Sequence, residues 1–147
     1  MYLKYYLLFF LIGLLFLTEQ PSNSLAITID NSLDEIISAY KEAHKQKKIE
    51  AVLALYYWEG VDERIKKSVF DNHRRYLDYK IVDIKVAKAP LKEYKPFTLD
   101  GKIYKTNLEV TKVLKVRFEN SAIISKEVTI PLGIKDGKYY FVTARPD

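Results

Sequence analysis

The amino-acid sequence predicts an α+β fold, in which three helices in the N-terminal half pack on an antiparallel β-sheet in the C-terminal half. The strands are predicted because apolar residues occupy every second position and polar residues fill most positions between them. The alternating apolar residues are Leu108, Val110, Leu114, Val116 and Phe118, and then Val128, Ile130, Leu132 and Ile134. The helices are predicted from apolar residues that recur at helical spacing upstream. A half-buried sheet needs an apolar cover, which these helices supply.

The first helix is predicted to run from about Leu33 to Lys47. Ser32 and Glu35 form a capping box at its start, in which the Ser32 hydroxyl accepts a hydrogen bond from the backbone of Glu35. Asn31 is an alternative cap. The apolar stripe of this helix consists of Leu33, Ile36, Ile37, Tyr40 and His44.

The second helix is predicted from about Ile49 to Trp58. It is apolar nearly all round, which indicates burial on more than one side, and Gly60 ends it. Asp62 and Glu63 open a third helix, because acidic side chains suit the first turn. The apolar side of the third helix consists of Ile65, Val69, Tyr76 and Leu77.

The rest of the chain is predicted to form strands and turns. The expected strands are Asp78–Val86, Phe97–Leu99, Ile103–Tyr104, Asn107–Phe118, Lys126–Ile134 and Tyr139–Thr143. Asp100-Gly101 and Asp136-Gly137 are hairpin signals, and Gly137 is expected to take a positive φ. Pro90 and Pro96 bracket a loop, because proline cannot donate to a strand ladder.

The composition narrows the possible functions. A chain of 147 residues is one domain by size and can bury a core without disulfides. It has no cysteine, which excludes disulfides and Cys-based zinc sites. The net charge is +5, but the lysines are scattered and form no nucleic-acid-binding motif. We therefore expect no nucleic-acid partner.

Residues 1–26 are predicted to be a signal peptide, and residues 27–147 a single domain. Lys4 is followed by an uncharged apolar run from Tyr5 to Thr18, which is shorter than the roughly 20 residues that cross a bilayer. Ser24 and Ala26 place small residues before a cleavage site after Ala26. We expect an exported protein, periplasmic or extracellular, without stable membrane insertion after cleavage. An uncleaved anchor is the alternative.

Three segments resemble a known superfamily. They are Leu55-Tyr56-Tyr57-Trp58, the strand Asn107–Leu114, and the closing segment Pro131–Tyr140. With the order of elements from about Ser32 to Thr143, these resemble the nuclear transport factor 2-like superfamily, also called the cystatin-like cone fold, and its secreted bacterial members of uncharacterised function. The resemblance implies a strongly curved, cone-shaped sheet under three helices. The superfamily includes isomerases and dehydratases with acid–base pairs, and many binding modules without catalysis.

The sequence contains no group that predicts catalysis. His44 and His73 lie on different predicted helices and are interpreted as partly exposed helix residues. Asp62 is better explained as a helix-start residue, and Asp83 lies on the polar side of its strand. Two histidines on different elements fall short of a metal site, so no metal or cofactor is expected.

A pocket lined by aromatic side chains is the functional hypothesis. Tyr40, Tyr56 and Tyr76 are each predicted to face the sheet, and Trp58 closes the second helix beside them. A tyrosine hydroxyl in an apolar core needs a hydrogen-bonding partner, which could be backbone, water or a ligand. The alternative is a solid core in which each hydroxyl reaches solvent. The candidate ligand-binding residues are Tyr40, Tyr56, Trp58, His73, Tyr76 and Lys112.

Lys112 is a candidate because it occupies the apolar side of its strand, as Lys80 does on the first predicted strand. A lysine that faces a core must reach water or an acid. A bulge near Lys112 is the alternative, because Val113 is apolar on the opposite side. Lys80 is interpreted as a strand-end residue.

Three functions remain open from the sequence. The first is a non-catalytic module that binds a small apolar or aromatic molecule or a partner protein. The second is a small-molecule isomerase or hydrolyase with an acid–base pair in the cone. The third is a structural homodimer that associates through the outer face of the sheet. A buried acid within reach of a histidine or tyrosine would favour the second, and a broad apolar outer face the third.

Overall fold

The computed structural model describes residues 22–90, 94–119 and 126–147. In these ranges the helices come first, as α1 (Ser22–Lys45), α2 (Ile49–Leu53) and α3 (Glu63–Tyr76). The strands follow as β1 (Lys80–Lys88), β2 (Phe97–Leu99), β3 (Lys102–Thr106), β4 (Lys112–Glu119), β5 (Lys126–Lys135), β6 (Lys138–Phe141) and β7 (Ala144–Pro146). All strand pairs are antiparallel. The predicted α+β class is therefore confirmed.

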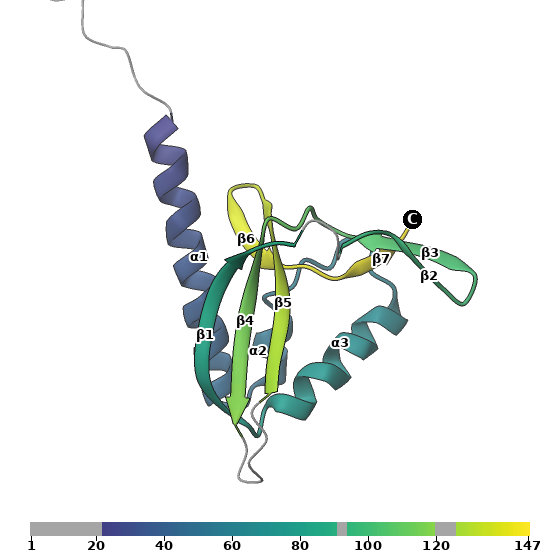
Figure 1. Cartoon of the computed structure of the whole chain (residues 1–147), viewed down its shortest axis with the longest axis horizontal. Coiled ribbons are helices and arrows are strands. Elements are labelled where there is room, and N and C mark those ends of the chain that lie inside the picture. The colour runs from purple at the N-terminus through teal and green to yellow at the C-terminus, as the bar shows by residue number, and fades with distance from the viewer. Residues whose placement is uncertain (1–21, 91–93, 120–125) are drawn as a thin grey trace, which may run out of the picture.

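The described strands form two sheets, whereas the sequence predicted one. Four strands pair in the order β1-β4-β5-β6, and three in the order β2-β3-β7. Figure 1 shows the β2–β3 hairpin and β7 extending beyond one end of the larger sheet. Strand β7 was not predicted from the sequence. It is a short strand that follows β6 in the chain but pairs with β3.

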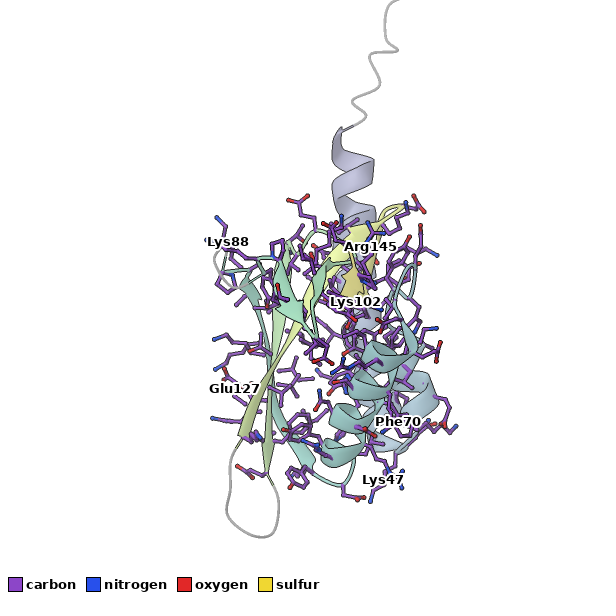
Figure 2. All side chains as sticks on the ribbon, turned by 90° about the vertical axis from the view of Figure 1, so that its right-hand side faces the viewer. Lys47, Phe70, Lys88, Lys102, Glu127 and Arg145 are labelled. Carbon is purple, nitrogen blue, oxygen red and sulfur yellow. The ribbon has the colours of Figure 1, made fainter. Side chains whose placement is uncertain are left out.

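The helices cover one face of the four-stranded sheet. Leu114, Val116 and Phe118 of β4 alternate with exposed charged residues, as predicted. They form one core with side chains of the helices and of the neighbouring strands, including Ile36, Tyr40, Val52, Ile65, Val69, Ile130, Leu132 and Phe141. Figure 2 shows this sheet with the helices on one side, and Glu127 on the other.

The first helix is longer than predicted. It begins at Ser22, so Ser32 lies inside it and the predicted capping box with Glu35 is wrong. The Ser32 hydroxyl instead accepts a hydrogen bond of 2.9 Å from the backbone N–H of Tyr139, and this joins α1 to β6. Residues 1–21 lie outside the described ranges, and the predicted cleavage site after Ala26 falls within α1.

The second helix is shorter than predicted, because the chain leaves the helix to pair with β6. The N–H of Phe141 donates to the carbonyl of Leu55 at 2.9 Å, and the N–H of Tyr57 donates to the carbonyl of Phe141 at 3.0 Å. Of the apolar residues that suggested a helix here, Tyr56 is buried, and Leu55, Tyr57 and Trp58 are half-buried beside the end of β6. The Trp58 indole N–H donates to the carbonyl of Leu53, which satisfies one group at the helix end.

The start of α3 is confirmed. Asp62 is its N-cap, and the carboxylate accepts a hydrogen bond of 2.9 Å from the N–H of Ile65. The turn between β5 and β6 is confirmed as well, since Asp136 and Gly137 have φ values of 50° and 76°. Two successive positive φ values match the twist that a two-residue hairpin needs.

The strand predicted from Asn107 begins only at Lys112. The segment before it crosses Gly133, where an added Cβ would lie 2.7 Å from the backbone oxygen of Glu109. Asn107 is buried, and its side-chain oxygen accepts a hydrogen bond of 3.1 Å from the N–H of Thr143. Its side-chain amide donates to the carbonyl of Tyr57. Asn107 therefore holds three distant segments together, a role that alternation cannot reveal.

Candidate functional site

A cavity of about 300 Å³ lies between α3 and β5. Tyr56, from the segment after α2, forms part of its wall, together with Val69, Asn72, His73 and Tyr76 of α3. Val128, Thr129, Ile130 and Pro131 of β5 form the opposite wall. The lining combines apolar and aromatic side chains with polar groups from Asn72, His73 and Thr129, a mixture that small-molecule sites use to orient a ligand.

A hydrogen bond between Tyr56 and His73 is the main polar feature of the wall. The Tyr56 hydroxyl lies 2.7 Å from Nε2 of His73. The bridge to Phe141 fixes Tyr56, and His73 lies one turn after Val69 on the buried side of α3. The two rings meet edge to face, with centroids 5.5 Å apart. The pair is therefore set by backbone pairing on one side and by helix packing on the other.

Further aromatic rings hold this pair in place. Tyr40 of α1 lies with its ring centroid 6.3 Å from that of His73, and it also packs edge-on against Phe141. Tyr76 stacks on Phe118 at a centroid distance of 5.2 Å and an interplanar angle of 12°. The tyrosines of the three helical segments thus face the sheet, as predicted.

Burial sets the protonation of both partners. It lowers the pKa of His73 from 6.5 to about 4, with a smaller contribution from His44. Burial also raises the pKa of Tyr56 well above 10, and a smaller effect of Tyr40 acts in the same direction. At neutral pH the pair therefore carries no charge. A neutral imidazole and a neutral phenol can exchange hydrogen bonds with a ligand but offer it no ion pair.

Five of the six predicted pocket residues lie in or beside this cavity. Tyr56, His73 and Tyr76 line it. Tyr40 is 1% exposed and lies behind His73. Trp58 packs against Tyr56 with ring centroids 5.1 Å apart. These two residues support the wall but are not part of its lining.

Lys112 lies apart from the cavity. Its ammonium group lies 5.6 Å from the ring centroid of Tyr139, a cation–π contact at the β6 side of the sheet. The bulge considered at Lys112 is wrong, because β4 and β5 pair without a shift from Lys112 to Phe118. The bulge lies instead in β1, between Ile81 and Asp83.

Three aspartates, among them Asp62 and Asp83 considered in the sequence analysis, have structural partners away from the cavity. Besides capping α3, Asp62 accepts a hydrogen bond of 2.8 Å from the Tyr104 hydroxyl. Asp71 pairs with Lys67 at 2.7 Å, and Asp83 pairs with Lys85 at 3.1 Å. Within the described ranges, no aspartate or glutamate lines the α3–β5 cavity.

His44 is more buried than predicted. Only 7% of it is exposed, and its Nε2 lies 2.7 Å from the carbonyl oxygen of Tyr79. A carbonyl can only accept, so Nε2 carries the proton. Its position at the end of the apolar stripe of α1 was the signal for burial, but the partner Tyr79 could not be read from spacing.

The described ranges hold no group of three His, Cys, Asp or Glu side chains that could bind a metal ion. No helix in those ranges is both long enough and apolar enough to cross a membrane. Neither a protein-family model nor a curated protein sequence matches this chain.

Proposed function

We propose that this protein is a non-catalytic binding module for a small, neutral, aromatic molecule, which enters the cavity between α3 and β5. The observation that carries the proposal is the hydrogen-bonded Tyr56–His73 pair in the wall of that cavity. It places two uncharged polar groups beside the apolar side chains of Val69, Val128 and Ile130. A ligand that matches it has an aromatic body and one hydroxyl or carbonyl group.

The pair retains hydrogen-bonding capacity for a ligand. A tyrosine hydroxyl has one donor and two acceptor sites, and its bond to His73 uses one of them. If Tyr56 donates to His73, its oxygen can still accept a ligand hydroxyl. If His73 donates, the Tyr56 hydroxyl can still donate to a ligand carbonyl.

The protonation states argue against proton-transfer catalysis. A general base works best when its pKa lies near the working pH, and the pKa of His73 is about 4. The pKa of Tyr56 is raised far above the working pH, so its hydroxyl is a poor general acid. No carboxylate of the described ranges lines the cavity to correct either value. The isomerase or hydrolyase hypothesis therefore ranks below binding.

The outer face of the larger sheet gives little support to the homodimer hypothesis. Lys115, Arg117 and Glu127 are exposed there, and Lys115 lies 3.5 Å from Glu127. A stable homodimer interface has an apolar centre, and charged residues are depleted from it.

The proposal includes membership of the nuclear transport factor 2-like superfamily, with the helices and the larger sheet enclosing a cone. It is supported by helices that precede the strands and cover one face of an antiparallel sheet. It also includes export, with cleavage of residues 1–26 to leave a periplasmic or extracellular protein. The short apolar run and the small residues Ser24 and Ala26 support this part.

A binding titration with 2-naphthol, followed by its fluorescence, tests the proposal. Wild-type protein should bind it, and Tyr56→Phe should bind about 3- to 10-fold more weakly because one hydrogen bond is lost. Tyr57→Phe is the matched control, since Tyr57 packs on Tyr140 and does not line the cavity. Naphthalene, which lacks the hydroxyl, should bind wild type and Tyr56→Phe with equal affinity.

Circular dichroism should show that each variant is folded. The absence of 2-naphthol binding by folded wild-type protein would refute the binding proposal. Equal affinity of wild type and Tyr56→Phe would show that the Tyr56–His73 pair does not recognise the ligand.

A further inference from the structure

A second and larger cavity, of about 700 Å³, lies where the C-terminal end of α1 meets the beginning of β1. In Figure 1 these two ends lie side by side. The lining consists of Lys41, His44, Lys45, Lys47 and the continuous segment 77–84. None of these residues lines the α3–β5 cavity. The volume is within the range of about 300–1,000 Å³ that small-molecule sites occupy.

One wall of this α1–β1 cavity is apolar. Leu77, Tyr79, Ile81 and Ile84 are each half-buried and pack against the main core, so part of each side chain is left uncovered. Covering apolar surface is favourable by roughly 25 cal/mol for each Å² removed from water. A hydrocarbon chain or ring on this wall would therefore be stabilised.

The rim of the α1–β1 cavity carries unbalanced positive charge. The two aspartates of the lining are compensated, because Asp78 pairs with Lys47 at 2.7 Å and Asp83 pairs with Lys85. Lys41, Lys45 and Lys80 are exposed, and within the described ranges none of them has an ion-pair partner. Lys41 and Lys45 are four residues apart on one helix, so both ammonium groups lie on the same side.

The frame of the cavity is preformed. The His44 side chain joins α1 to the residue before β1 through its bond to the Tyr79 carbonyl, and its ring lies 5.3 Å from that of Phe118. The Lys47–Asp78 ion pair links the same two parts of the chain a short distance away. A preformed site loses less conformational entropy when a ligand binds.

We infer that the α1–β1 cavity binds an amphiphilic monoanion, with an apolar chain and one carboxylate. The chain lies on the wall formed by Leu77, Ile81 and Ile84. The carboxylate lies at the rim, where Lys41, Lys45 and Lys80 donate charge-assisted hydrogen bonds. This inference is independent of the function proposed for the α3–β5 cavity.

Calorimetric titration with laurate, below the concentration at which it forms micelles, tests the inference. The triple variant Lys41→Gln, Lys45→Gln, Lys80→Gln should bind laurate at least tenfold more weakly than wild type. The matched control is Lys88→Gln, Lys95→Gln, Lys135→Gln, which removes the same charge from exposed lysines outside the described cavities. The control should stay within twofold of wild type.

Ligand variants test the two halves of the site on unmodified protein. Dodecanol keeps the chain without the charge, and hexanoate keeps the charge with a shorter chain, and each should bind at least tenfold more weakly than laurate. Laurate should leave bound 2-naphthol in place. Equal losses in the two triple variants, equal affinity for laurate and dodecanol, or displacement of 2-naphthol by laurate would each overturn the inference.

Discussion

Acid should destabilise this protein through His73, and the size of the effect follows from its environment. Burial holds the pKa of His73 at about 4 in the folded protein, against 6.5 in an unfolded chain. Above pH 6.5 the imidazole is neutral in both states, so its contribution to stability is complete. Between pH 6.5 and pH 4 only the unfolded chain takes up the proton, and the free energy of unfolding falls. Below pH 4 both states are protonated and no further change follows.

The full shift corresponds to about 3 kcal/mol, at 1.36 kcal/mol for each pH unit. Because His73 is partly exposed, solvent screens some of this, and we expect about 2 to 3 kcal/mol. The pKa values of Asp62, Asp71 and Asp78 are lowered in the folded protein, chiefly by hydrogen bonds to their carboxylates. The stability that these three groups contribute is therefore lost mainly below about pH 4, where the unfolded chain takes up their protons.

Urea unfolding of wild type and His73→Gln, at pH values from 7 to 4.5, measures the effect. Glutamine can still hydrogen-bond Tyr56 but does not titrate, so the difference between the two proteins reports the titration of His73. The wild-type free energy of unfolding should fall more steeply on acidification. Since the chain has 2 histidines, NMR titration of untagged protein should separate their ring signals. Parallel stability curves, or a His73 ring that takes up a proton near pH 6.5, would refute the reasoning.

Two further predictions test the fold and the N-terminal segment. Gly133→Ala should lower the free energy of unfolding by about 1–3 kcal/mol, because its Cβ would lie 2.7 Å from the backbone oxygen of Glu109. In the control Gly137→Ala the new Cβ meets nothing within 4 Å, so only the positive φ should lower the free energy of unfolding, by about 1 kcal/mol. A Gly133→Ala protein as stable as wild type would contradict the close packing at Gly133. Intact-mass measurement of exported protein should give a chain that begins at Ile27, whereas full-length protein in the membrane fraction would support the anchor.

The parts of the fold that local chemistry fixes could be predicted from the sequence. Asp62 reads as a helix start because a carboxylate accepts hydrogen bonds from unpaired N–H groups, and it does so here. Gly137 reads as a turn because a left-handed backbone excludes most side chains, and its φ is 76°. The alternation of β4 gave the buried face from Leu114 to Phe118 correctly.

The parts that failed depend on residues far away in the chain. Leu55 and Tyr57 fit the apolar pattern of the helix predicted before them. Their backbone groups instead hydrogen-bond to the backbone of Phe141, so the chain leaves the helix. Ser32 matches a cap, yet its hydroxyl is used by Tyr139, more than a hundred residues later. Such competition has no signal in a local window, because the partner lies outside it.

In the candidate site, too, the need for a hydrogen-bonding partner was predictable from the sequence, but the partner itself was not. A buried tyrosine hydroxyl needs a hydrogen-bonding partner, and Tyr56 has one in His73. Three of the predicted residues, Tyr56, His73 and Tyr76, do meet in one cavity. What the sequence could not supply was the identity of the partner, since Tyr56 and His73 approach only when β6 fixes one and α3 carries the other. That identity decides the chemistry. A carboxylate beside Tyr56 would have kept a charge in the wall and favoured proton transfer, whereas a desolvated imidazole is neutral at pH 7 and favours a neutral ligand.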